Sequence, residues 1–172
     1  KYLSAFDTLD VDSQIPKQPA FAQVKEFEKE YPVAENEEEE GKAFLSYNMV
    51  VGDARDSMLG VAFDVLDYAL LSAPGAPLKK ALLDAGIGKD IYGSYNDGFL
   101  QPYFSVIAKD ARTEQKEEFV AVIRKVLQDI VKNGIDKKAI LAGINYMEFR
   151  YREADFGSYP KGLMYGLDII GT

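Results

Sequence analysis

The amino-acid sequence predicts an α+β domain in which helices cover one face of a mainly antiparallel sheet. Segments with strand periodicity come first and are joined by short polar connections, which favours antiparallel hairpins. Segments with helical periodicity follow as a group towards the end of the chain. Strands grouped before helices are typical of this fold class. The length of 172 residues and the hydrophobic content of 47% suit one globular domain.

The composition excludes several kinds of chemistry. The chain has neither cysteine nor histidine, so serine–histidine and cysteine–histidine catalysis and the usual zinc sites have no ligands or bases here. The net charge of −8 repels nucleic acids and anionic lipid surfaces. Neither an apolar run of about 18 residues nor a leader peptide stands out. We expect a soluble chain without nucleic-acid or membrane partners, and the cytoplasm is the favoured location.

Residues 1–18 predict a linker arm, because Pro16 and the neighbouring Pro19 interrupt a polar stretch without a sustained period. Residues 19–172 predict a single α+β domain. A last helical stretch begins at Lys161 and runs to the final residue, Thr172. This suggests a domain cut from a longer parent chain.

The first two strands are expected to form a hairpin. Phe21–Tyr31 has a β-like pattern dense in Lys and Glu, with Phe27 on one side, and predicts an exposed strand. The acidic run Glu35–Glu40 follows. Because consecutive glutamates point in different directions, a solvated loop is favoured there over a cation site. Ala43–Val51, with alternating apolar residues, predicts the second strand.

A helical pair and two further strands follow. Asp56–Leu71 has apolar residues at helical spacing and little polar surface, so it predicts a largely buried helix. A turn at Ser72–Pro77 separates it from a short helix, Leu78–Ala85, which ends at Gly86. The pattern of apolar residues and glycines in the sequence then predicts two strands joined by a turn, at Ile87–Asn96 and Gln101–Lys109.

The remaining chain predicts helices. Thr113 is expected to cap a helix that ends at Asn133-Gly134, and Asp136 to cap the next one. The first of these helices has apolar residues along one side, and this side is expected to face the core. The apolar residues are Phe119, Val122, Ile123, Val126, Leu127, Ile130 and Val131. The residues expected to be mostly buried are Phe63, Phe104, Phe119, Ile123 and Val126.

Several strings closely resemble the second domain of presequence proteases, in the insulinase/pitrilysin family of metallopeptidases. These strings occur in the same order from about Pro19 to the C-terminus, and cover nearly the whole chain. They are LLSAPGAPL at Leu70–Leu78, LLDAGIG at Leu82–Gly88, LQPYFS at Leu100–Ser105, YMEF at Tyr146–Phe149 and GSYPKGL at Gly157–Leu163.

The resemblance implies a metallohydrolase-like domain of the insulinase and mitochondrial processing peptidase type. In that family two halves close around a peptide, and zinc is held only by the first domain, through an H-x-x-E-H motif. This motif has no counterpart here, so no catalytic, cofactor-binding or metal-binding residue is carried over. The implied partners are a peptide substrate and the other domains of the parent, and the implied role is to enclose the substrate.

The resemblance also implies a substrate exosite at Ser72, Gly75, Tyr92, Gly93 and Ser94, in a loop and a strand that contain glycines. The alternative for these positions is structural: Gly75 makes a turn and Gly93 a bulge. An alternative for the whole chain is a catalytically silent structural or assembly domain of the same superfamily. An H-x-x-E-H motif upstream in the parent would separate these two functions.

Overall fold

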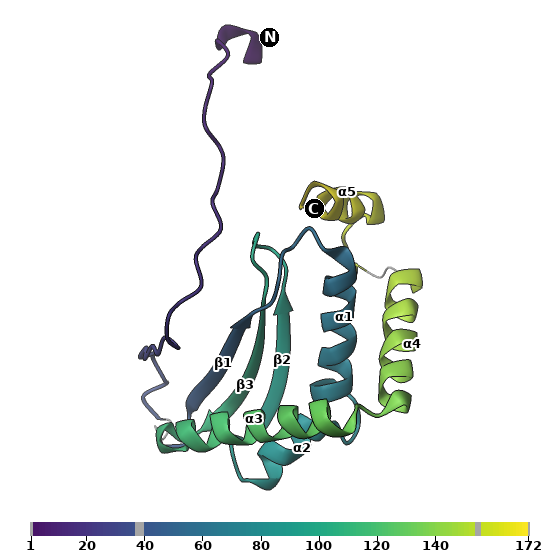
Figure 1. The fold of residues 1–172 in the computed structure, drawn as a ribbon. Coiled ribbons are helices and arrows are strands. Elements are labelled where there is room, and N and C mark those ends of the chain that lie inside the picture. The colour runs from purple at the N-terminus through teal and green to yellow at the C-terminus, as the bar shows by residue number, and fades with distance from the viewer. Residues whose placement is uncertain (1, 37–39, 154–155, 172) are drawn as a thin grey trace.

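The computed structural model describes residues 2–36, 40–153 and 156–171. A three-stranded antiparallel sheet, in the order β1-β3-β2, has helices packed against one of its faces (Figure 1). The predicted α+β class is confirmed. The strands are β1 (Ala43–Val50), β2 (Asp90–Asn96) and β3 (Tyr103–Ala111). The helices are α1 (Ser57–Asp67), α2 (Pro77–Asp84), α3 (Lys116–Asn133), α4 (Lys137–Glu153) and α5 (Lys161–Gly171), with a π-helical turn at Tyr68–Ser72 and 3₁₀ turns at Leu3–Ala5 and Thr113–Gln115.

The strand register divides the sheet into a covered and an uncovered face. Val106 on the central strand lies opposite Tyr47 of β1 and Gly93 of β2, and all three belong to the face under the helices. Alternate residues of each strand point to the other face. Phe104, Val106 and Ala108 are buried on the covered side, as their spacing predicts.

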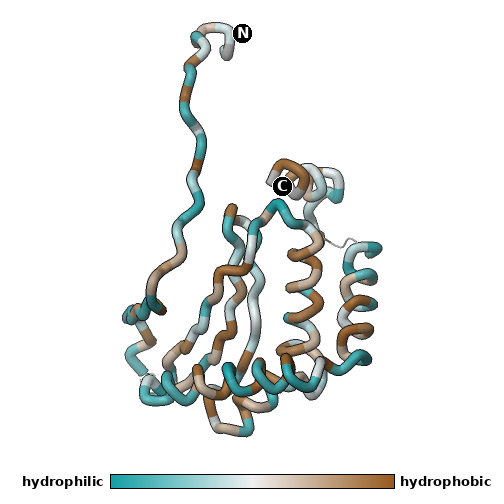
Figure 2. Tube along the Cα trace, in the orientation of Figure 1, coloured by the Kyte–Doolittle hydropathy of each residue, from teal (hydrophilic) through white to brown (hydrophobic). Residues whose placement is uncertain are grey.

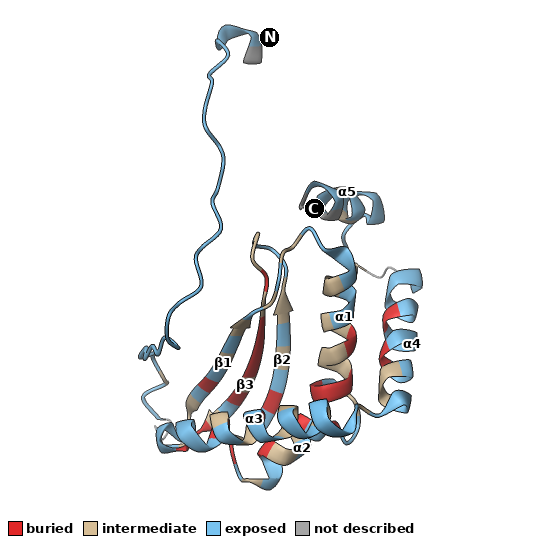
Figure 3. Cartoon of the chain, in the orientation of Figure 1, coloured by how far each residue is buried: buried red, intermediate tan, exposed pale blue. Residues whose placement is uncertain are grey.

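The core lies between this covered face and the helices. Its fully buried side chains come from α2, from the π-helical turn, from strands β2 and β3, and from α3, where Phe119 and Ile123 are 1% and 0% exposed. Figure 3 shows the buried residues gathered on the sheet and on the inward sides of the helices. Phe63 and Val126 are half-buried rather than mostly buried, because they lie at the margin of this cluster.

The predicted strand at Phe21–Tyr31 is wrong. This segment is irregular, and β1 pairs only with β3 among the described strands, so the predicted hairpin does not form. Phe27 is 84% exposed, so its ring does not pack on the sheet, although Tyr31 at the end of the segment contacts Phe44 of β1 with ring centres 5.6 Å apart. Strand addition without such burial contributes little stability. Residues 37–39 of the acidic connection lie outside the described residues.

Side chains nevertheless attach this N-terminal segment to the domain. Lys17 forms an ion pair with Asp53, and Lys116 donates to Glu26 over 2.7 Å. Gln18 and Gln101 exchange two hydrogen bonds, with N to O distances of 2.6 and 3.1 Å. The extended stretch that precedes these contacts runs away from the sheet in Figure 1.

The helix predicted at Asp56–Leu71 is confirmed, but its expected burial holds only for its C-terminal part. Met58 is 76% exposed, whereas Val65 and the three residues from Ala69 are buried. The reason is that α1 packs along β2 and α4 with one side only. Figure 2 shows hydrophobic residues along much of α1.

One helical stretch of the described chain, Ser57–Asp84, could cross a membrane by its length and composition. The expectation that no such run exists is therefore wrong on composition alone. The backbone becomes extended at Ala73 and interrupts the helix there. The continuous helical part therefore consists of the 11-residue α1 and the five-residue π-helical turn. At 1.5 Å per residue this part is about 24 Å long, short of the ~30 Å hydrocarbon core. Only 22% of the most apolar 18 residues of Ser57–Asp84 are buried in the structure.

The C-terminal helices form as predicted, with differences at their ends. Thr113 does not cap α3, because it lies in a 3₁₀ turn whose Arg112 N–H donates to the Gln115 side chain over 3.0 Å. Val131 is 86% exposed, so the apolar side of α3 extends beyond the end of the core that it covers. Asp136 does cap α4, by accepting from the N–H of Lys138.

Candidate functional site

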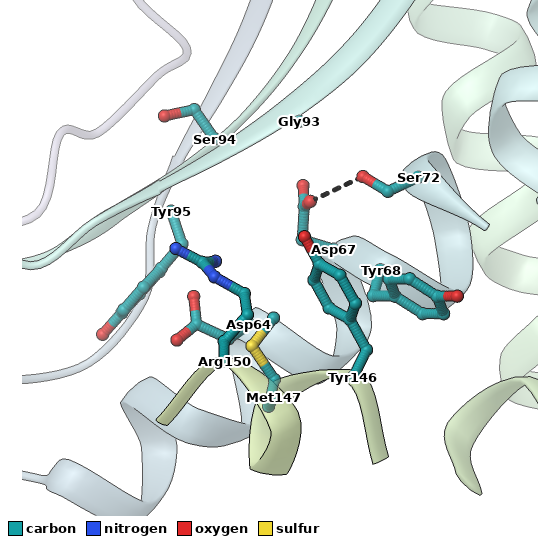
Figure 4. Close-up of a pocket in the computed structure, with 10 residues that line it drawn as sticks. All are labelled: Asp64, Asp67, Tyr68, Ser72, Gly93, Ser94, Tyr95, Tyr146, Met147 and Arg150. Carbon is teal, nitrogen blue, oxygen red and sulfur yellow. Dashed lines mark hydrogen bonds between the residues drawn. The ribbon is translucent and has the colours of Figure 1, made fainter. Parts of the chain in front are cut away.

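An open cavity of about 520 Å³ lies where the end of α1, the π-helical turn, the edge strand β2 and α4 meet (Figure 4). The residues that line it come from segments far apart in the sequence. They are Asp64, Asp67, Tyr68, Ser72, Gly93, Ser94, Tyr95, Tyr146, Met147 and Arg150.

The π-helical turn gives this cavity its polar wall. The helix continues after Asp67 in a wider, π-helical turn, which brings Ser72 next to Asp67. The Ser72 hydroxyl donates a hydrogen bond of 3.1 Å to Asp67 Oδ2. Single π turns occur often at functional sites. The turn ends where Ala73 becomes extended, before the Pro74-Gly75 turn.

Gly93 allows the helix and the strand to approach each other closely. A Cβ atom at Gly93 would lie 1.8 Å from Asp67 Oδ1 and 2.6 Å from Leu71 Cδ1. The register of β2 with β3 runs without a shift through Gly93 and its neighbours, so the interpretation of Gly93 as a bulge is wrong. The glycine is instead needed because the acidic side chain packs directly on the strand.

Asp67 is the least satisfied polar group of the cavity. Its Oδ1 is buried and has no hydrogen-bond partner among the described residues. Burial raises the pKa of Asp67, and the Ser72 hydrogen bond only partly offsets this. A buried carboxylate oxygen without a hydrogen-bond partner destabilises the folded chain. A hydrogen-bond donor or a cation placed next to this oxygen would therefore be stabilising.

Asp64 lies one helical turn earlier and has a different environment. Burial raises its pKa, nearby Asp97 raises it further, and Arg150 lowers it. The Arg150 guanidinium carbon lies 5.9 Å from the centre of the Tyr146 ring, within the range of a cation–π contact. Arg150 therefore offsets only part of the rise in the pKa of Asp64, and Asp67 is hydrogen-bonded by the neutral Ser72 hydroxyl.

Aromatic rings form the remaining walls. Tyr68 and Tyr146 stack, with ring centres 4.8 Å apart and planes 23° apart. Tyr95 stacks on Phe63 at 5.4 Å. Carboxylates flanked by aromatic faces are suited to an organic cation, because the rings contact an aliphatic stem while the acid holds the charge.

The structure brings together part of the predicted exosite. Ser72, Gly93 and Ser94 line the cavity, although the Ser94 side chain points away from Asp67 (Figure 4). Gly75 lies in a turn with φ of 74°, as its structural interpretation predicts, and Tyr92 is on the opposite face of the sheet.

The sequence analysis missed Asp67, Asp64 and Tyr146 as residues of a site. The available signal was a pair of aspartates, three residues apart, on an otherwise apolar helix. Such a pair shares one helix face and is costly to bury, so it marks a site more often than an acidic loop does.

The uncovered face of the sheet is a second surface of interest. Phe44, Val50 and Tyr92 are exposed there, while Ser105 is buried and donates to Asn48 Oδ1 over 2.5 Å. In the described ranges, no group of three or more acidic residues could hold a metal ion. With no histidine or cysteine in the chain, its residues do not fit a zinc site.

Comparisons with known proteins agree with this architecture. A family model described as "Peptidase M16 inactive domain" matches residues 1–147. Protein HypA of Clostridium perfringens is 46% identical over 172 residues, which are 100% of this chain and 18% of that protein. Presequence protease 1, chloroplastic/mitochondrial, of Arabidopsis thaliana is 29% identical over 174 residues, which cover 99% of this chain and 16% of that protein.

A solved structure has the same fold. It is the inactive peptidase domain of a protein assigned as a zinc protease from Bordetella parapertussis, with a TM-score of 0.63 and 11% sequence identity, covering 74% of this chain and 69% of that chain. The chain spans less than a fifth of the length of the two curated relatives, since it covers 18% and 16% of them.

Proposed function

The chain belongs to the peptidase M16 family, as an inactive domain of that family, and on this premise we propose that it helps to enclose peptides that a larger zinc metallopeptidase degrades. In this proposal the zinc is held by another domain of the parent, and this domain forms part of the chamber wall. The great length of the relatives supports it, because most of each lies outside the region that resembles this chain.

The observation that carries the proposal is the one-sided covering of the sheet. Helices pack against one face, and the other face exposes aromatic and apolar residues from β1 and β2. An exposed apolar face of this kind favours contact with another molecule. An extended peptide could lie across it, with its side chains against Phe44 and Tyr92.

The outer edge of β2 supports an exosite next to this wall. No described strand pairs with that edge, so its backbone N–H and C=O groups are free to receive an extended peptide as a further strand. The proposed exosite consists of Ser72, Gly75, Tyr92, Gly93 and Ser94, as the resemblance implies. Gly93 would contribute backbone groups, since its side-chain position is filled by Asp67.

A comparison of long and short peptides tests the proposal in the parent protein. Tyr92→Ala should lower kcat/KM about five- to tenfold for peptides of about 30 residues, because an apolar contact outside the catalytic domain is lost. Peptides of about six residues should change less than twofold, because they do not reach this domain. Tyr92 is 37% exposed, so its removal should leave the fold intact.

Phe149→Ala is the matched control, because Phe149 is an exposed aromatic residue on α4 rather than on the sheet. This variant should cleave both peptide classes like the unmodified parent. If Tyr92→Ala affects neither class, or both equally, the enclosing role is contradicted, and a catalytically silent structural role is the better account.

A further inference from the structure

The cavity beside β2 is lined by more acidic than basic side chains. Asp64 and Asp67 both line it, and Arg150 is the cationic residue among the lining residues. Arg150 lies over the Tyr146 ring, whereas Asp67 accepts a hydrogen bond from the neutral Ser72 hydroxyl and its Oδ1 has no partner among the described residues. One acidic group, Asp67, is therefore left for an external partner.

We propose that this cavity binds a lysine or arginine side chain of a peptide, with Asp67 as the acceptor of the positive charge. The inference rests on the proposed peptide-binding function, and adds a substrate class to it: peptides with a basic residue next to the segment that lies along β2.

The depth of Asp67 favours a long side chain. The carboxylate lies beneath the strand, against Gly93, while the free backbone edge of β2 is on the outside (Figure 4). A peptide on that edge would need an extended aliphatic stem to reach the acid. The stacked pair Tyr68 and Tyr146 lines the route and can pack against methylene groups.

The chemistry of the acid supports a cationic ligand over a neutral one. The Ser72 hydroxyl fills one position on Oδ2 and leaves the carboxylate with further acceptor capacity. A charged donor to a half-buried carboxylate forms a stronger hydrogen bond than a neutral donor. The surrounding rings add attraction for a cation.

The test measures peptide affinity in the full-length parent, treated with a metal chelator and checked to leave the probe uncut. The probe is an N-acetylated, fluorescein-labelled peptide of about 15 residues with one lysine, and its partner has norleucine in place of lysine. The parent should bind the lysine peptide about tenfold more tightly, as a charge-assisted hydrogen bond implies.

Asp67→Asn should remove this tenfold preference and leave the affinity for the norleucine peptide within twofold. Asparagine keeps an acceptor for Ser72, so the fold is retained. Asp64→Asn is the second variant and should lower the preference by a smaller factor, because its charge is shared with Arg150. Asp129→Asn, an exposed position on α3, is the charge-matched control and should change nothing.

Three results would overturn the inference. Equal loss of both peptides in Asp67→Asn would make Asp67 a structural residue. An unchanged preference in that variant would place the cation elsewhere. A preference that appears only when the N-terminus is free would assign the binding to the α-ammonium group. In each case, binding of the norleucine peptide by the unmodified parent would leave the proposed peptide-enclosing function intact. A parent that binds neither peptide would contradict both that function and the present inference.

Discussion

At the scale of single residues, the contact between Gly93 and Asp67 is the feature that joins the fold to the site. The strand lacks a side chain where the acid packs, so helix and sheet approach within van der Waals distance. The same contact removes water from Asp67 Oδ1 and leaves it without a partner. The contact between Asp67 and Gly93 thus explains both the close packing of α1 on β2 and the unpaired carboxylate oxygen.

Gly93→Ala should lower the free energy of unfolding of the chain by about 1–3 kcal/mol, because the new methyl group overlaps Asp67 and Leu71. Asp67→Ala in the same background should recover part of this loss, since it removes the nearer obstacle. Denaturant unfolding of the single and double variants measures both effects.

Gly162→Ala is the control for this pair. Gly162 lies in α5 with nothing within 4 Å of its Cβ position, so alanine should leave stability unchanged or raise it slightly. Independent, additive effects of Gly93→Ala and Asp67→Ala would show that the two residues do not share the contact.

The sequence predicted some of these residues and not others, for a physical reason. Ser72, Gly93 and Ser94 belong to strings with a recognisable resemblance. Asp67 and Arg150 become neighbours only when α4 folds back on α1. That approach uses Gly143, whose Cβ position lies 3.2 Å from the Val65 side chain, and nothing in the local pattern specifies it.

At the scale of secondary-structure elements, α3 shows how far an apolar stripe reports burial. Its first turns cover the sheet, where Phe119 and Ile123 are buried, and its end passes beyond the core, where Val131 is exposed. Helical spacing fixes which side of a helix is apolar. It does not fix the length over which a partner lies beneath that side.

Ile123→Ala should destabilise the chain by about 2–4 kcal/mol, because it leaves a cavity in the closely packed core. Val131→Ala, near the other end of the same stripe, should stay within about 0.5 kcal/mol. Thermal unfolding of the two variants gives the comparison. Similar losses at both positions would mean that the end of α3 is covered in solution.

The elements that the sequence predicted correctly carry their own signals. Helices α1 to α5 and strands β1, β2 and β3 have clear periodicity with turn residues at their ends. Phe21–Tyr31 has alternation as well, but its apolar residues Phe21, Val24 and Phe27 stay exposed. No described strand pairs with this segment, and propensity alone does not supply a partner.

At the scale of the whole molecule, the sheet has one face that helices cover and one face that they leave exposed. The helices complete the core on the first face, and the second remains exposed over β1 and β2. The fold class and the family resemblance were evident from the sequence. The cavity on the covered side, between β2, α1 and α4, was not, because it depends on how these elements pack together.

The central claim is that a peptide lies on this uncovered face, and photo-crosslinking tests it most directly. A benzophenone side chain placed at Ser46, an exposed position of β1 on that face, should capture a biotinylated peptide of about 30 residues in the chelator-treated parent. The same group at Arg124, exposed on α3, should capture none. Capture at Arg124 alone, or at neither position while the untreated parent cleaves that peptide, would contradict the account.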